Sequence, residues 1–254
     1  MYGTEAMTHL NEKEIRELER IEEDQMRNIM QVKTGIQVPL HLMYLDLGQT
    51  PARYQIYRYK MNFLQYILHQ KEESLLSRML YAQQIRPVRG DWFSGVRQIM
   101  EDMHIIMKIE DIKNMSRREF RNLTKLRCEE AAFSDLISKR NKGSKGRYLS
   151  YGAKLEMSDY LCPNNQLTVD DQRLIFQIRN QSNPLPANRG DPQPCFRGCG
   201  EIQDNCHIVE CSLLDKEERR DYNLLINGTF HEMKNNSEQW KKNLNIIEAM
   251  DSVL

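Results

Sequence analysis

Long apolar runs and aromatic residues are both scarce in this chain of 254 residues, where aromatics make up 8%. No stretch comes near the roughly 18 consecutive apolar residues that indicate a membrane helix. The segment MYGTEAMTHLNEKE at 1–14 has no basic region followed by an apolar one, which is the order found in secretory signals. The sequence therefore predicts neither a signal peptide nor a membrane span, and no membrane partner.

Cysteine is also sparse and unevenly placed. Four of the six cysteines lie between positions 195 and 211, which leaves Cys128 and Cys162 isolated. A small secreted disulfide scaffold carries its cysteines more densely and more evenly. The pattern is typical of a reducing compartment and predicts an intracellular protein of the cytoplasm, the nucleus or both.

There is no excess of either charge, because 36 Lys and Arg balance 36 Asp and Glu. The balance conceals an uneven distribution. Residues 1–24 carry eight acids against three bases, whereas residues 113–147 carry eleven bases against four acids. A basic segment of this kind favours a polyanionic partner for the second region.

The remaining composition is rich in Glu, Lys, Arg, Leu, Met and Ile, and it predicts a mostly α fold. We expect a helical region at 1–140, a linker at 141–165 and a zinc-knuckle module with flanking helices at 166–254. Capping residues, prolines and glycines predict helices at 11–32, 39–48, 50 to beyond 67, 74–85, 91–105, 116–140, 168–179, 213–226 and 237–250. In the first of these, the expected apolar stripe is Ile15, Leu18, Met26, Ile29 and Met30, with Ile21 at its edge.

The densest group of metal-binding residue types is the stretch PCFRGCGEIQDNCHIVECS at 194–212. Cys195, Cys199, His207 and Cys211 have the spacing Cys-x3-Cys-x7-His-x3-Cys, which can present three thiolates and one imidazole to a structural Zn²⁺. Cys206 competes with His207, but only His207 lies one helical turn before Cys211. The alternative is four buried cysteines without a metal.

Two groups of residues are candidates for binding nucleic acid. Cations that neutralise phosphates and aromatic rings that stack on bases are the residue types required. The first group is a basic loop flanked by Tyr148 and Tyr151, comprising Lys139, Arg140, Lys142, Lys145 and Arg147. The second lies inside the knuckle and comprises Phe196 and Arg197. For the first group, the alternative is a solvated loop without a partner. For the second, the alternative is that the Phe196 ring packs under the metal.

A further set of cations recurs at helical spacing within 116–140. These residues are Arg117, Arg118, Arg121 and Lys125. They can extend the basic surface, or they can pair with Glu129 and Glu130 along the helix.

Several short motifs occur in a characteristic order along the chain: Met1-Tyr2-Gly3-Thr4-Glu5, Arg27-Asn28-Ile29-Met30, Val38-Pro39, Leu45-Asp46-Leu47-Gly48, Arg58 to Leu64, Ile175-Phe176-Gln177-Ile178-Arg179, and the Cys195 to Cys211 motif. The order resembles the polyproteins of non-LTR, LINE-like retrotransposons downstream of the reverse transcriptase palm. The resemblance covers about residues 1–70 and 165–215. It implies the C-terminal portion of such a protein, whose full-length relative would be an RNA-directed DNA polymerase.

The resemblance also implies that this chain is not itself the enzyme. The palm carboxylates of that family hold two Mg²⁺ ions, whereas Asp170 and Asp171 follow Thr168 in the pattern of helix-start acids. We therefore expect an accessory, non-catalytic region that binds element RNA or target DNA, with the palm as a further partner. The alternative is a helical protein–protein interaction module that binds no nucleic acid.

Overall fold

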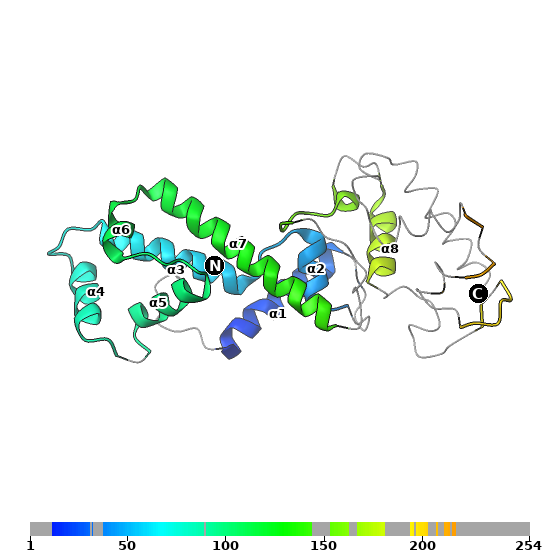
Figure 1. Cartoon of the computed structure of the whole chain (residues 1–254), viewed down its shortest axis with the longest axis horizontal. Coiled ribbons are helices and arrows are strands. Elements are labelled where there is room, and N and C mark those ends of the chain that lie inside the picture. Colours follow the sequence, from blue (N-terminus) through cyan, green and yellow to red (C-terminus); the bar gives the residue numbers. More distant parts are fainter. Residues whose placement is uncertain are drawn as a thin grey trace. The chain divides into compact units, whose positions relative to one another are not determined.

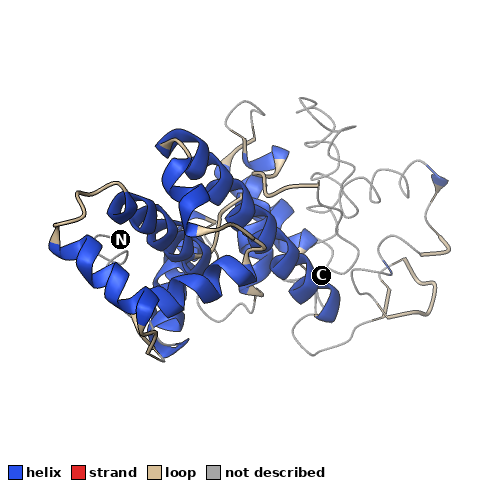
Figure 2. Ribbon diagram, turned by 60° about the vertical axis from the view of Figure 1, so that its left-hand side comes forward, coloured by secondary structure: helices blue, strands red, loops and turns tan. Residues whose placement is uncertain are grey.

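The computed structural model describes the following residues: 12–30, 32, 38–88, 90–143, 153–162, 167–180, 194–195, 197–202, 207, 211–213 and 215–216 (Figure 1). Over this part of the chain the protein is mostly helical and contains no strand (Figure 2), which confirms the mostly α part of the predicted fold class; the zinc-knuckle module and the C-terminal helices stay predictions. None of the described helices is long and apolar enough to cross a lipid bilayer. The elements are α1 (Glu12–Ile29), α2 (Leu40–Leu47), α3 (Ala52–Leu68), α4 (Leu75–Ile85), α5 (Trp92–Asp102), α6 (Ile109–Asn114), α7 (Arg117–Lys142), the 3-10 helix η1 (Asp159–Leu161) and α8 (Val169–Arg179).

The chain divides into two compact units, each of which joins separate stretches of sequence. Unit 1 comprises Met1–Asp24 and Thr50–Asp135, and unit 2 comprises Gln25–Gln49 and Leu136–Leu254. Helices α1 and α7 each contribute residues to both units. The predicted division into a helical region at 1–140, a linker at 141–165 and a module at 166–254 stays a prediction. The predicted helices at 213–226 and 237–250 fall almost entirely outside the described residues.

Most helix starts lie where the capping residues predict them. The Ser74 hydroxyl accepts a hydrogen bond from Ser77 N at 3.2 Å, and the Asp91 carboxylate accepts one from Ser94 N at 2.6 Å. A reciprocal capping box begins α7, because Ser116 N donates to Glu119 Oε2 at 3.1 Å and Glu119 N donates to Ser116 Oγ at 3.2 Å. These caps satisfy backbone N–H groups that have no partner within the helix.

The region after α5 differs from the prediction. The helix ends at Asp102 instead of continuing to Ile105, because Met103 and His104 turn the chain away. His104 adopts a left-handed φ of 52°. A short helix, α6, then follows, with the Asp111 carboxylate accepting a hydrogen bond from Lys108 N at 3.2 Å.

The apolar stripe predicted for α1 is partly wrong. Ile29 is 65% exposed, because it is the last helical residue and the chain leaves the helix at that point. Ile21, predicted at the edge of the stripe, is also exposed. The stripe members that the structure buries fully or partly are Ile15, Leu18, Met26 and Met30.

Acidic residues of α1 stabilise the start of α3. The N-cap position of α3 is Pro51, which has no side-chain hydrogen bond to offer. Glu22 takes this role, because its carboxylate accepts hydrogen bonds from Ala52 N at 2.8 Å and from Gln55 Nε2 at 3.3 Å. A carboxylate at a helix N-terminus also interacts favourably with the helix dipole. At least one of the acidic residues at 1–24, Glu22, therefore forms its contacts within unit 1.

The core of unit 1 forms around α3, which packs against α4, α5 and α6. Of the apolar face predicted for α3, Ile56 and Ile67 are buried, whereas Phe63 is half-buried with its ring edge-on to Trp92 at 5.7 Å between centroids. The completely buried side chains of this core are Met61, Leu64, Val96, Ile112, Phe120 and Ala132.

Unit 2 contains a buried polar network centred on Asp46 of α2. The Asp46 carboxylate pairs with Arg179 Nη2 at 3.3 Å, and it accepts hydrogen bonds from Ser158 Oγ at 2.9 Å and Asn180 Nδ2 at 3.4 Å. Asp46, Arg179 and Asn180 are fully buried, and the Arg179 guanidinium lies 5.7 Å from the centre of the Tyr160 ring. Asp46 and Arg179 are 133 residues apart in sequence. The network therefore joins the motif Leu45-Asp46-Leu47-Gly48 to the motif Ile175-Phe176-Gln177-Ile178-Arg179, both of which belong to the predicted resemblance.

Gly48, which ends α2, allows residues 156–157 to approach closely. It adopts a left-handed φ of 62°, and a Cβ atom at this position would overlap the backbone of Glu156 and Met157. An alanine here would meet both backbone strain and a collision with main-chain atoms that cannot rotate away.

We therefore expect Gly48→Ala to lower the free energy of unfolding of unit 2 by about 2–5 kcal/mol, combining a left-handed penalty of about 1–2 kcal/mol with an overpacking cost of about 1–3 kcal/mol. Urea titration followed by amide hydrogen exchange in α2 and α8 measures this loss. Gly90→Ala is the matched control, because Gly90 also has a positive φ of 87° but a Cβ there meets no atom within 4 Å. Equal losses in the two variants would contradict the close approach at Gly48.

Candidate metal centre

The first two cysteines of the cluster lie on a tight turn of the backbone. Pro194 and Ile202 form an antiparallel bridge, and Cys195 N donates to the Glu201 carbonyl at 2.7 Å. Inside this turn, Gly198 N donates to the Cys195 carbonyl at 2.9 Å. Gly198 has a φ of 78°, a conformation that glycine adopts without a side-chain penalty. The turn directs Cys195 and Cys199 toward a common point.

The other two candidate ligands are one helical turn apart, as their spacing predicts. Cys211 N donates to the His207 carbonyl at 2.8 Å, which is the backbone hydrogen bond of a single α-turn. Positions i and i+4 lie on the same face of such a turn. The imidazole of His207 and the thiol of Cys211 can therefore approach the two earlier cysteines together.

The structure brings all four predicted ligands together. One ligand atom from each of Cys195, Cys199, His207 and Cys211 lies within 4.8 Å of the others. The Cys195 and Cys211 sulfurs are 3.8 Å apart, and Cys199 Sγ lies 3.1 Å from His207 Nε2. Cys195 and Cys211 are buried, and the other two are half-buried. The cluster can hold a metal ion, and Cys206, the competing ligand, lies outside the described residues.

The surroundings shift the pKa values of Cys195 and Cys199 in opposite directions. Burial raises the pKa of Cys195, but the backbone N–H of Arg197 and hydrogen bonds with His207, Cys199 and Cys211 outweigh it and lower the pKa to about 7. For Cys199, the backbone N–H of Glu201 lowers the pKa, while burial and the neighbouring thiols raise it above its usual value. Such opposite shifts are expected when several thiols share one small space, because the first thiolate disfavours the second.

Four protein donors fill a tetrahedral coordination sphere. A metal in such a site has no open position for water or substrate, so it stabilises a fold and does not activate a reactant. In this cluster, ligands 16 residues apart are brought to within contact distance. A metal bound here would hold the segment 195–211 together.

The predicted nucleic-acid-binding residues are only partly described by the structure. Lys139 and Lys142 are exposed near the end of α7, and Arg140 is half-buried with its guanidinium donating to Asn141 Oδ1 at 2.9 Å. Cations in the last turn also interact favourably with the helix dipole. Arg197 is half-buried beside the cluster. The remaining predicted residues, Lys145, Arg147 and Phe196, and the flanking Tyr148 and Tyr151, lie outside the described residues.

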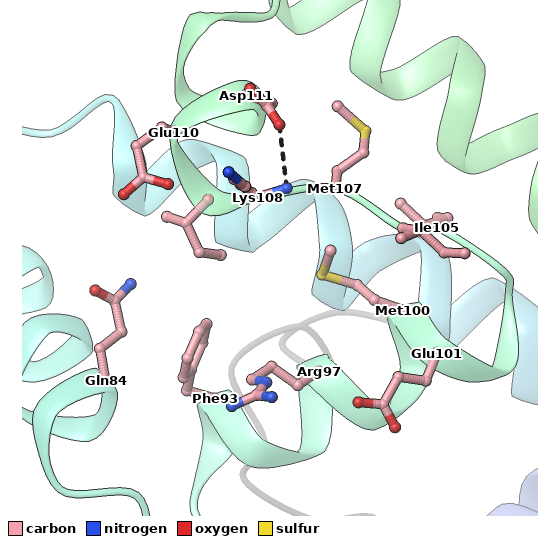
Figure 3. A pocket seen from close by; sticks show the side chains of 12 residues that line it. Gln84, Phe93, Arg97, Met100, Glu101, Ile105, Met107, Lys108, Glu110 and Asp111 are labelled. Atoms are coloured by element: carbon pink, nitrogen blue, oxygen red, sulfur yellow. Dashed lines mark hydrogen bonds between the residues drawn. The ribbon is translucent and has the colours of Figure 1, made fainter.

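Unit 1 contains a surface hollow of about 720 Å³ beside α5 and α6 (Figure 3). Its apolar lining includes Phe93, Met100 and Ile105. The charged residues that line it are Arg97, Glu101, Lys108, Glu110 and Asp111. Among the described residues that line it there is no Ser, Cys or His. It is a mixed apolar and charged surface.

The fold and the cluster define a mostly helical protein with a Cys3His group that can hold a metal ion. Comparisons of the chain with protein-family models, with curated proteins and with solved structures found no match. The resemblance to retrotransposon polyproteins therefore stays a prediction from the sequence motifs.

Proposed function

We propose that the chain binds nucleic acid without catalysing a reaction, and that a structural Zn²⁺ at the Cys3His cluster holds its binding knuckle together. The observation that carries the proposal is the convergence of Cys195, Cys199, His207 and Cys211. Three thiolates and one imidazole form a donor set typical of structural zinc.

The distances within the cluster support zinc. With Zn–S bonds of about 2.3 Å, two ligands of a tetrahedron are separated by about 3.8 Å, and the Cys195 and Cys211 sulfurs are 3.8 Å apart. A sulfur and a nitrogen ligand would be about 3.5 Å apart. Cys199 Sγ and His207 Nε2 are closer, at 3.1 Å, so metal binding would separate this pair slightly.

A nucleic-acid partner is supported by what surrounds the cluster in sequence. Arg197 lies between the first two ligands, next to Phe196, and the basic segment 113–147 supplies a cationic surface. Zinc knuckles use such residues to contact phosphates and to stack on unpaired bases. The motif order resembling LINE-like retrotransposon proteins points to element RNA or target DNA as the partner.

The adjacent aspartates favour an accessory role over polymerisation. Asp171 Oδ2 accepts a hydrogen bond from Thr168 N at 2.8 Å, and Asp170 Oδ1 pairs with Arg173 Nη2 at 2.9 Å. Both carboxylates are thus engaged at the start of α8, where acids stabilise the helix N-terminus. A two-metal polymerase centre requires carboxylates that are available to Mg²⁺.

Fluorescence anisotropy of a labelled single-stranded RNA, titrated with the zinc-loaded chain, tests this proposal. We expect tight binding at low salt that weakens about 300-fold for a fourfold rise in salt, because some six phosphate contacts to a single strand would each contribute about 0.7 to the salt slope. Chelation of the zinc is expected to weaken binding strongly. Absence of binding at low salt would reject the proposal.

A protein–protein interaction module is the second candidate function, and one observation favours it. Helix α4 and the residues after it carry large exposed apolar side chains, namely Leu75, Met79, Tyr81, Ile85 and Val88. Exposed apolar surface is typical of docking sites. An apolar interface keeps its affinity as salt rises, whereas nucleic-acid binding loses it.

A further inference from the structure

Helix α7 begins with a strongly cationic surface that no acid of the described residues neutralises. Arg117, Arg118 and Arg121 are all exposed, and none of them forms an ion pair with another described residue. Lys125, one turn further on, pairs with Glu129 at 3.8 Å, and both side chains are partly exposed. The single acid among the first turns, Glu119, is occupied in the capping box with Ser116.

The side of α7 that carries these cations is fixed by its contacts with α3. Gln65 Nε2 donates to the Met115 carbonyl at 3.1 Å, just before α7 begins, and Thr124 Oγ1 donates to Asn62 Oδ1 at 3.1 Å. Later residues of α3 thus meet earlier residues of α7, so the two helices run antiparallel. Figure 1 shows α7 lying along α3 in this way.

The register places cations and aromatic rings on the same side of this helix pair. Successive residues advance by about 100° around a helix. Tyr59 and Tyr66 lie about 70–90° around α3 from the midpoint of Asn62 and Gln65, the two α3 residues that make these contacts. Arg118 and Lys125 lie about 100–120° around α7 from Thr124, in the same rotational sense. Because the helices are antiparallel, these two rotations lead to the same side. We call this surface the α3–α7 face, and its residues are Tyr59, Tyr66, Arg118, Arg121 and Lys125.

The aromatic part of the α3–α7 face is suited to stacking. Tyr66 is 44% exposed, and its ring is stacked on Phe63 with 5.8 Å between centroids and 12° between planes. Phe63 is in turn held edge-on by the buried Trp92. Phe63 thus covers one face of the Tyr66 ring, and the opposite face is left for a ligand. The Tyr59 ring lies 5.4 Å from the Arg58 guanidinium, which adds positive charge to the same helix.

We propose that the α3–α7 face binds single-stranded nucleic acid, with its cations on phosphates and Tyr66 stacked on a base. Charge complementarity identifies a polyanion, and the fixed ring selects a strand whose bases are free to stack. In a duplex the bases are stacked on one another, so a duplex would contact only the cations of this surface and not the Tyr66 ring. The inference rests on the proposed function for its class of partner, but it assigns a second surface, in unit 1, apart from the metal centre in unit 2.

The test compares charge-reversal variants of the full zinc-loaded chain in anisotropy titrations with labelled oligo(U) and with an RNA duplex. R118E/R121E is expected to weaken oligo(U) binding more than tenfold and to lower the salt slope by about 1.4, because each phosphate contact to a single strand contributes about 0.7. The control is R78E/R97E, which makes the same change in net charge at two exposed positions of α4 and α5. It is expected to weaken binding much less.

Stacking is tested separately at Tyr66. Tyr66→Ala is expected to weaken oligo(U) binding about tenfold with little change in salt slope, which corresponds to the loss of one base–aromatic stack. Tyr66→Phe keeps the ring and is expected to restore binding. Circular dichroism and zinc content, unchanged in every variant, establish that the fold and the metal centre are intact.

The outcomes separate this inference from the proposed function. Equal weakening by R118E/R121E and R78E/R97E, or a duplex bound as tightly as oligo(U), would overturn the α3–α7 face. Cys199→Ser affects only the metal centre. If this variant binds oligo(U) normally while R118E/R121E does not, the knuckle proposal fails and the face stands. If Cys199→Ser abolishes binding while R118E/R121E leaves it intact, the reverse holds.

Discussion

Removal of the proposed zinc is expected to unfold the segment 195–211 while α1 to α8 keep their helical structure. Structural zinc sites supply about 10–16 kcal/mol of apparent binding free energy, which is the main folding energy of a module this small. Among the described residues of the segment, the Pro194–Ile202 bridge and the backbone hydrogen bonds at Gly198 and Cys211 are local contacts. Cys199→Ser is expected to have the same local effect, because it removes one of the four ligands.

Zinc content, circular dichroism and amide hydrogen exchange together check this expectation. The zinc-loaded chain should contain one zinc per molecule, and Cys199→Ser should lose it with only a small decrease in helical signal. Cys162→Ser is the matched control, because Cys162 is half-buried in unit 2 and is not part of the cluster. It should retain its zinc. Global unfolding of Cys199→Ser would show that the knuckle is not a separate module.

The Cys3His cluster could be predicted because all four of its residues lie within one short stretch of sequence. Two cysteines on a tight turn, followed by a histidine and a cysteine one helical turn apart, define the geometry from local rules alone. The structure brings His207 together with Cys195, Cys199 and Cys211, which is the set that this spacing predicts. The identity of the metal and the bound partner depend on chemistry outside the chain, and they stay predictions.

Most of the fold was also predictable, for a similar reason. Helix starts at Ser74, Asp91 and Ser116 depend on side chains that cap their own backbone. What the sequence rules missed depends on partners far along the chain. Glu22 caps α3 from 30 residues away, and nothing local indicates this contact.

The Asp46 network is the clearest of these distant contacts. A carboxylate within the apolar run LHLMYLDL, and an arginine at the end of IFQIR, are each unusual enough to indicate a buried pair. The available signal was a pair of complementary charges, each placed beside apolar residues in its helix. The sequence contains many Arg and Asp residues, however, and only the fold determines which of them meet.

Removing one member of this pair is expected to destabilise unit 2 strongly. Asp46→Ala leaves the Arg179 guanidinium buried without its carboxylate, and breaking a buried ion pair in this way costs about 3–5 kcal/mol. Hydrogen exchange of α2 and α8 amides, together with urea unfolding, measures the loss. The exposed pair of Asp170 and Arg173 provides the control on the same helix, and Asp170→Ala should cost less than about 1 kcal/mol.

A double variant separates the value of the ion pair from the cost of an unpaired charge. Replacing both partners by apolar residues, as in Asp46→Leu with Arg179→Met, removes the buried charges together. Such replacements are often neutral or stabilising, because the desolvation of two charges offsets their attraction. We therefore expect the double variant to be more stable than Asp46→Ala by about 3–5 kcal/mol. If it is equally unstable, the stability of unit 2 depends on the hydrogen bonds from Ser158 and Asn180 to Asp46 rather than on the pairing of its charge.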